Sequence, residues 1–95
     1  MSEEKIIKHI IEEIQNSYPF TKVEVRENDG MYKIWELRVG WYYLGEERAY
    51  KTIIMKKNMT SNYEDYINDL VSRIIYDIFM DCRKQKEERK KENEN

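Results

Sequence analysis

Two turn signals divide residues 20–56 into three strand-length segments, and this division constrains the fold more than any other feature of the chain. Asn28-Asp29-Gly30 is a strong hairpin signal, and Leu44-Gly45-Glu46-Glu47 is the second turn. Polar and apolar residues alternate over residues 20–27, from 31 to about 39 or 43, and over about 48–56. The pattern predicts a three-stranded antiparallel meander.

Two features of these strands affect which side chains are expected at the surface of the sheet. Gly40 lies inside the second strand and predicts a bulge or a bend there. The third strand carries apolar residues on both faces, so the sequence leaves open which face is buried.

Apolar residues at helical spacing flank the strands on both sides. Residues 3–16 predict a helix that begins after the cap residue Ser2 and ends before Pro19. Residues 61–82 predict a second helix with Thr60 or Ser61 as its cap and a broader apolar stripe. The apolar positions of the two helices are Ile6, Ile7, Ile10, Ile11 and Ile14, then Ile67, Leu70, Val71, Ile74, Ile75, Ile78, Phe79 and Cys82.

The element order is therefore α-β-β-β-α, which predicts an α+β fold. We expect a three-stranded antiparallel sheet with both helices packed on one face. Residues 1–82 form the single α+β domain of this prediction. Residues 83–95 carry good helix formers but no apolar face, so they are expected to be a charged helical extension or a disordered tail.

Charge and cysteine content limit the classes of protein to which the chain is expected to belong. Residues 1–82 carry eleven Lys and Arg against fifteen Asp and Glu, whereas residues 83–95 carry six against four. The body is thus mildly acidic and the tail mildly basic. Cys82 is the single cysteine, so no intrachain disulfide forms, and a cytoplasmic protein is the expectation. No stretch of about 18 apolar residues is present, which predicts no membrane span.

The sequence lacks a recognisable catalytic constellation. His9 is the single histidine and has no nucleophile or second ligand near it in sequence, while Cys82 lies on the apolar stripe as a buried thiol. One histidine and one cysteine cannot build a structural zinc site, and no nucleotide-binding or hydrolase motif occurs. We therefore expect a protein that is not an enzyme and that has neither a cofactor nor a metal.

Six of the twelve aromatic residues fall between positions 32 and 50, more than one small sheet face needs. Tyr and Trp bury large areas at low entropic cost, and for that reason they dominate protein interfaces. We expect at least one ring of the run 41–43 to be exposed, with nearby glutamates meeting a basic patch on a partner. The predicted partner-binding residues are Trp41, Tyr42, Tyr43, Glu46 and Glu47.

Two other contact modes follow from the second helix and the tail. The second helix can offer Tyr66, Phe79 or Met80 outward, which predicts a possible homodimer. The alternative to a protein partner is nucleic acid, with exposed sheet aromatics stacking bases and the tail holding phosphates through Arg83, Lys84, Lys86, Arg89 and Lys90. The element order resembles that of double-stranded-RNA-binding domains, but residues 60–65, where that family has lysines, are acidic here.

The leading functional hypothesis is a small non-enzymatic binding protein that acts by protein–protein contact. Its acidic α-β-β-β-α layout is similar to that of some small anti-CRISPR inhibitors. Its composition, with one alanine and many Ile, Lys and Asn, indicates an AT-rich genome and suits a phage or mobile element. The layout thus implies an accessory or inhibitor protein of the anti-defence type. The shared feature is the layout alone, since no motif is shared.

Overall fold

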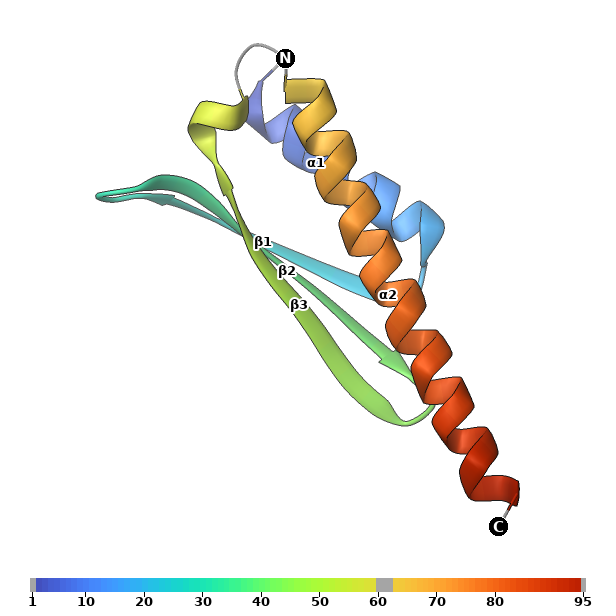
Figure 1. Ribbon diagram of the computed structural model, residues 1–95. Helices are drawn as coiled ribbons and strands as arrows, with labels where there is room; N and C mark the ends of the chain where they lie inside the picture. Colours follow the sequence, from blue (N-terminus) through green and yellow to red (C-terminus); the bar gives the residue numbers. More distant parts are fainter. Residues whose placement is uncertain (1, 60–62, 95) are drawn as a thin grey trace.

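The computed structural model describes residues 2–59 and 63–94, and it has the predicted α+β architecture. The elements are α1 (Glu3–Ser17), β1 (Thr21–Asp29), β2 (Lys33–Tyr43), β3 (Glu46–Met55), a 3-10 turn η1 (Lys56–Met59) and α2 (Tyr63–Glu94). The sheet order is β1-β2-β3 with antiparallel pairing throughout, and both helices lie on one face of the sheet (Figure 1).

Local signals set the ends of α1 and the first turn as predicted. The Ser2 hydroxyl accepts a hydrogen bond from the Lys5 N–H at 3.3 Å. The Tyr18 N–H bonds back to the Ile14 carbonyl at 2.8 Å, immediately before Pro19. In the β1–β2 turn, the Gly30 N–H donates to Asn28 Oδ1 at 3.0 Å. The predicted caps of the second helix, Thr60 and Ser61, lie outside the described residues.

The core lies between the sheet and the two helices. α1 contributes four isoleucines, and α2 contributes a buried stripe that includes Ile67, Ile74 and Ile78. The central strand β2 buries every second side chain against them, namely Trp35, Leu37, Val39 and Trp41. On β3, Ile54 is fully buried and Ile53 is 52% exposed, so the face with Tyr50, Thr52 and Ile54 is the inner one.

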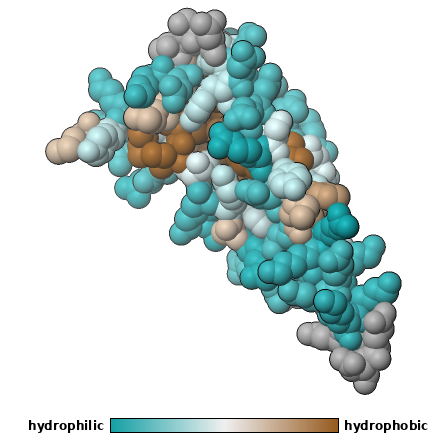
Figure 2. Space-filling view, viewed as in Figure 1, coloured by the Kyte–Doolittle hydropathy of each residue, from teal (hydrophilic) through white to brown (hydrophobic). Residues whose placement is uncertain are grey.

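α2 continues without a break through the charged C-terminal segment to Glu94. Its last turns extend beyond the end of the sheet (Figure 1), and Figure 2 shows hydrophilic residues over the part of this extension that precedes the grey tip. The first part of the segment still contacts the body. Gln85 is 5% exposed, and Arg89 Nη1 donates to the Leu44 carbonyl in the β2–β3 turn at 2.9 Å.

Candidate functional site

Trp41, the first of the predicted partner-binding residues, is a core residue. Its side chain is 6% exposed, and its indole Nε1 donates to Asp81 Oδ2 of α2 at 2.8 Å. Position 41 shares the helix-facing side of β2 with Trp35 and Val39, because alternate residues of a strand point the same way. Trp41 therefore packs in the core of the monomer, and its indole does not belong to the exposed surface on which a partner was expected.

The other four predicted residues divide between the two faces of the sheet. Tyr42 pairs with Glu47 in the β2–β3 register, and Tyr43 pairs with Glu46. Tyr43 is on the helix side, half-buried, with its ring stacked on Phe20 at a centroid distance of 6.1 Å. Glu46 forms an ion pair with Arg48. Tyr42, which is 65% exposed, and Glu47 point to the opposite side. The predicted residues thus do not form one surface.

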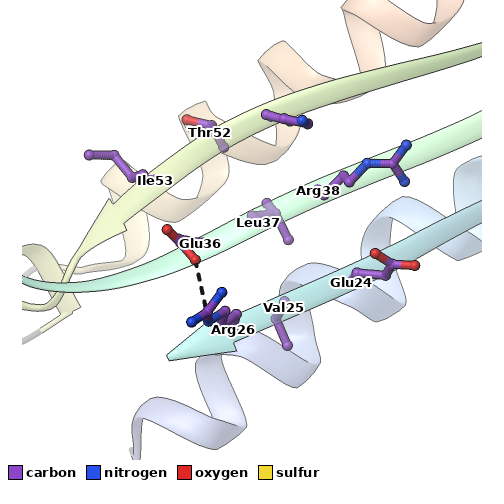
Figure 3. A pocket seen from close by; sticks show the side chains of 9 residues that line it. Glu24, Val25, Arg26, Glu36, Leu37, Arg38, Thr52 and Ile53 are labelled. Carbon is purple, nitrogen blue, oxygen red and sulfur yellow. Dashed lines mark ion pairs between the residues drawn. The ribbon is translucent and has the colours of Figure 1, made fainter. Parts of the chain in front are cut away.

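Tyr42 and Glu47 belong to a face of the sheet that neither helix covers, which we term the open sheet face. Figure 3 shows Glu24, Arg26, Glu36 and Arg38 on this side of the sheet, with both helices behind it. A shallow hollow of about 530 Å³ lies at its centre. From the strand alternation and register, the face carries Lys22, Glu24 and Arg26 of β1, Glu36, Arg38, Gly40 and Tyr42 of β2, and Glu47, Ala49, Lys51 and Ile53 of β3.

The charges on the open sheet face are unevenly compensated. Lys22 Nζ lies 3.2 Å from Glu24 Oε1, and Arg26 Nε lies 3.9 Å from Glu36 Oε2, the pair drawn as a dashed line in Figure 3. Arg38 and Lys51 belong to neither pair, although Glu24 lies opposite Arg38 in the β1–β2 register.

Arg38 and Lys51 face each other directly across β2 and β3. Neither forms an ion pair with any of the residues that the structure describes. Like charges at opposed positions of neighbouring strands destabilise a sheet. The centre of the open sheet face is therefore a site where an added anion would be stabilising.

Gly40 shapes this site in a way that the sequence did not reveal. The register runs through Lys22, Gly40 and Ala49 without a slip, so the predicted bulge or bend is not present in the pairing. A Cβ atom at position 40 would lie 3.2 Å from Arg38 Nη1. The missing side chain leaves the space beside residue 40 to the Arg38 guanidinium.

Outside the open sheet face, the described side chains that could take part in catalysis do not lie together as a catalytic group. His9 is exposed on α1 and lines a small groove with Tyr63 and Glu64. Burial raises the pKa of the Cys82 thiol, and the neighbouring Asp81 carboxylate adds to the rise, which disfavours the nucleophilic thiolate. In residues 2–59 and 63–94, no group of three His, Cys, Asp or Glu side chains has the geometry to hold a metal ion.

Two polar centres that sequence reasoning missed join elements of the fold. Asp81 accepts hydrogen bonds from Trp41 and Gln85. Lys56 forms ion pairs with Glu27 and Asp29 of the β1–β2 hairpin, and its side chain is only 14% exposed. Asp81 lies between the apolar residues Met80 and Cys82 in the sequence, which is a weak signal of its role, whereas Lys56 is followed by Lys57 and the sequence gives no such signal.

The tail residues proposed for nucleic-acid contact are partly engaged by the protein itself. Arg83 Nε lies 3.3 Å from Glu87 Oε1, and Arg89 donates a hydrogen bond to the Leu44 carbonyl. Lys84, Lys86 and Lys90 are exposed on the helical extension.

No family model, curated protein or solved structure matches the chain. No helix of the described part combines the length and the apolar content that a bilayer crossing requires. The geometry of the surface is consequently the basis for any functional argument.

Proposed function

We propose that the chain is a small non-enzymatic binding protein whose open sheet face contacts another protein. The observation that carries the proposal is the directly opposed pair Arg38 and Lys51, neither of which forms an ion pair with a described residue, at the centre of a face that no helix covers. The partner surface would present a carboxylate between these two cations. An inhibitor of the anti-defence type, as the layout implies, would act by occupying its target with such a surface.

Apolar surface beside the basic pair supports a protein partner. Ile53 is 52% exposed and lines the central hollow, although isoleucine is among the residues most often buried. Covering the exposed half of this side chain is favourable by about 1 kcal/mol. Tyr42, at one end of the face, is a typical interface residue because its ring buries area with little loss of rotamer freedom.

The charge sign of the partner differs from the sequence-based expectation. Glutamates at the hairpin end were expected to meet a basic patch; Glu46 is paired with Arg48 within the chain, whereas Glu47 is exposed at one end of the open sheet face. The free charges at the centre of the open sheet face are basic instead. The partner of the proposal accordingly carries acidic side chains next to an apolar one.

The test is a comparison of two charge-matched variants as baits. The face variant Arg38→Gln with Lys51→Gln removes the central cations, and the control Lys5→Gln with Lys8→Gln removes two exposed cations from α1. Each bait is incubated with nuclease-treated lysate of the host cells, and captured proteins are quantified by mass spectrometry. We expect a protein that wild type and control retain and that the face variant loses by at least tenfold. Equal capture by all three baits would refute the proposal.

Nucleic acid is the second candidate, because the exposed ring of Tyr42 shares a face with Arg38 and Lys51. In that case a ring would stack on a base while the cations hold phosphates, together with the basic tail. Binding of a fluorescent single-stranded oligonucleotide would then fall with salt with a log–log slope of about −0.7 per phosphate contacted. An oligonucleotide that binds wild type and control but not the face variant would favour this function over the protein partner.

A further inference from the structure

The side of α2 that faces solvent carries a regular seam of eight residues. Successive members are separated by four and three residues in strict alternation, which is the spacing of the a and d positions of a coiled coil. All eight side chains are exposed, whereas the buried residues of α2, such as Ile67, Ile74 and Ile78, lie on its opposite side. The α2 seam consists of Asp65, Asp69, Ser72, Tyr76, Phe79, Arg83, Lys86 and Lys90.

The chemistry of the α2 seam changes in order along the helix. Its N-terminal members Asp65 and Asp69 are acidic, its middle is aromatic, and its C-terminal members are all basic. Tyr76 and Phe79 at the centre are 60% and 49% exposed. When two copies of this helix lie antiparallel, the acidic end of each meets the basic end of the other and the two aromatic centres meet. The seam is therefore complementary to a second copy of itself.

We propose that a second copy of the chain binds along the α2 seam, antiparallel, about a two-fold axis that passes between residues 77 and 78. In this register Tyr76 packs on Phe79 of the partner copy. Towards the ends, Asp69 meets Lys86 of the partner copy and Asp65 meets Lys90 of the partner copy. The symmetry repeats each contact, as an isologous interface requires.

The a and d assignment of the seam agrees with this register independently of charge. With Asp69, Tyr76, Arg83 and Lys90 at a positions, the members Asp65, Ser72, Phe79 and Lys86 occupy d positions. Antiparallel helices pack a against d layers, and every proposed layer joins one position of each type. A parallel pair would instead place Asp65 on Asp65 and Lys90 on Lys90, which is repulsive.

Ion pairs within α2 are compatible with the proposed interface. Asp69 Oδ2 lies 2.9 Å from Arg73 Nη2, and Arg83 Nε lies 3.3 Å from Glu87 Oε1. A carboxylate accepts several hydrogen bonds, so Asp69 can bind a lysine of the partner copy while it keeps Arg73. Lys86 and Lys90, which would supply the opposite charges, take part in none of the ion pairs found in the described residues.

The experiment measures the mass of the full chain by sedimentation velocity at about 100 µM, within the range of weak specific association. We expect wild type to sediment at twice the monomer mass of 11.8 kDa. The variant Lys86→Glu with Lys90→Glu makes the seam acidic at both ends, and we expect a monomer. The control Lys5→Glu with Lys8→Glu makes the same charge change on α1 and should remain dimeric. A monomeric wild type, or a dimeric seam variant, would overturn the proposal.

A second variant separates a lost interface from a damaged fold. Asp65→Lys with Asp69→Lys makes the seam basic at both ends, so this chain alone should also be monomeric. Mixed with the acidic-seam variant, it should form a one-to-one heterodimer, which neither chain could do if misfolded. Failure of the mixture to associate would contradict the proposed pairing.

Spin labels test the direction of the helices. A label at Lys91→Cys, in a chain with Cys82→Ser, lies about 20 Å along the helix from the proposed axis, so the two labels of an antiparallel dimer would be about 40 Å apart. A separation below about 20 Å by electron paramagnetic resonance would indicate a parallel pair and would exclude this register.

Discussion

Asp81→Ala removes the carboxylate that joins α2 to the β2–β3 hairpin. Asp81 Oδ2 accepts from Trp41 Nε1 at 2.8 Å and from Gln85 Nε2 at 2.6 Å. Asp81 Oδ1 lies 3.5 Å from Arg48 Nε. The Asp81 carboxylate thus accepts hydrogen bonds from a core indole and a buried amide and forms an ion pair with an arginine of β3. We expect its loss to destabilise the fold.

The size of the effect follows from the burial of the two donors. Trp41 and Gln85 are 6% and 5% exposed, so water does not readily replace the lost acceptor. A buried donor left without a partner costs about 1–3 kcal/mol. The Arg48 pair is partly exposed and adds at most about 1 kcal/mol, and alanine recovers about 0.5 kcal/mol through its higher helix propensity. Because two donors lose their acceptor, the free energy of unfolding should fall by about 2–6 kcal/mol.

Urea unfolding followed by tryptophan fluorescence measures this change. Asp77→Ala is the matched control, because Asp77 is exposed on the same helix, and it should change the free energy of unfolding by less than about 0.5 kcal/mol. A double-mutant cycle with Trp41→Phe should give a coupling energy of about 1–2 kcal/mol. If Asp81→Ala costs no more than the control, the carboxylate does not join the two elements and the reasoning is wrong.

Three further predictions test the turn, the thiol and the acid limit of stability. Leu44→Asn should raise the free energy of unfolding by about 0.5–1 kcal/mol in urea titration, because residue 44 has a φ of 51°, which asparagine adopts more readily than leucine; a loss of stability would contradict this. Cys82 should react with a thiol reagent more slowly than a Ser17→Cys thiol in a Cys82→Ser chain, since burial raises the pKa of the Cys82 thiol; equal rates would contradict it. The hydrogen bond from Lys56 lowers the pKa of Asp29 in the folded protein. The ionised Asp29 carboxylate therefore stabilises the fold at pH values above its unfolded pKa of about 4. This stabilisation is lost as the pH falls through the lower pKa of the folded state. Asp29→Asn should flatten the acid limb of thermal stability below about pH 4, and an unchanged limb would show that this pair does not contribute.

Periodicity was sufficient to predict the order and packing side of the elements, since helix stripes and strand alternation report directly on which faces are buried. It was less reliable at Trp41. That residue has the same strand parity as Trp35 and is buried, and the exposed ring expected in the run 41–43 is that of Tyr42. The bulge or bend expected at Gly40 is absent, because the pairing runs through this residue unchanged; a Cβ atom there would lie 3.2 Å from Arg38 Nη1. The spare surface expected at the indole therefore lies in the core.

The third strand and the tail show a second limit of sequence reasoning. β3 has isoleucine on both faces, and the inner face is decided by register, which places Ile54 opposite Trp35. Gln85 lies in a segment with no apolar face, yet its side chain is buried against the hairpin. Such contacts depend on where α2 crosses the sheet, and residue pattern alone carries no information on that crossing.

The two proposed surfaces lie on opposite sides of the molecule, and this arrangement has a consequence for binding strength. The open sheet face points away from the helices, and the α2 seam lies on the helix side of the sheet, where Phe79, Arg83 and Lys86 also line a groove with Phe20 and Tyr43. Pairing through the seam would therefore leave both open sheet faces uncovered. A dimer would then bind a surface that carries several partner molecules with greater apparent affinity than one molecule in solution. The acidic-seam variant should lose this gain on a densely coated surface and keep the one-to-one affinity, whereas Arg38→Gln with Lys51→Gln should lose both. An equal loss of both affinities in the seam variant would show that the two surfaces are not independent.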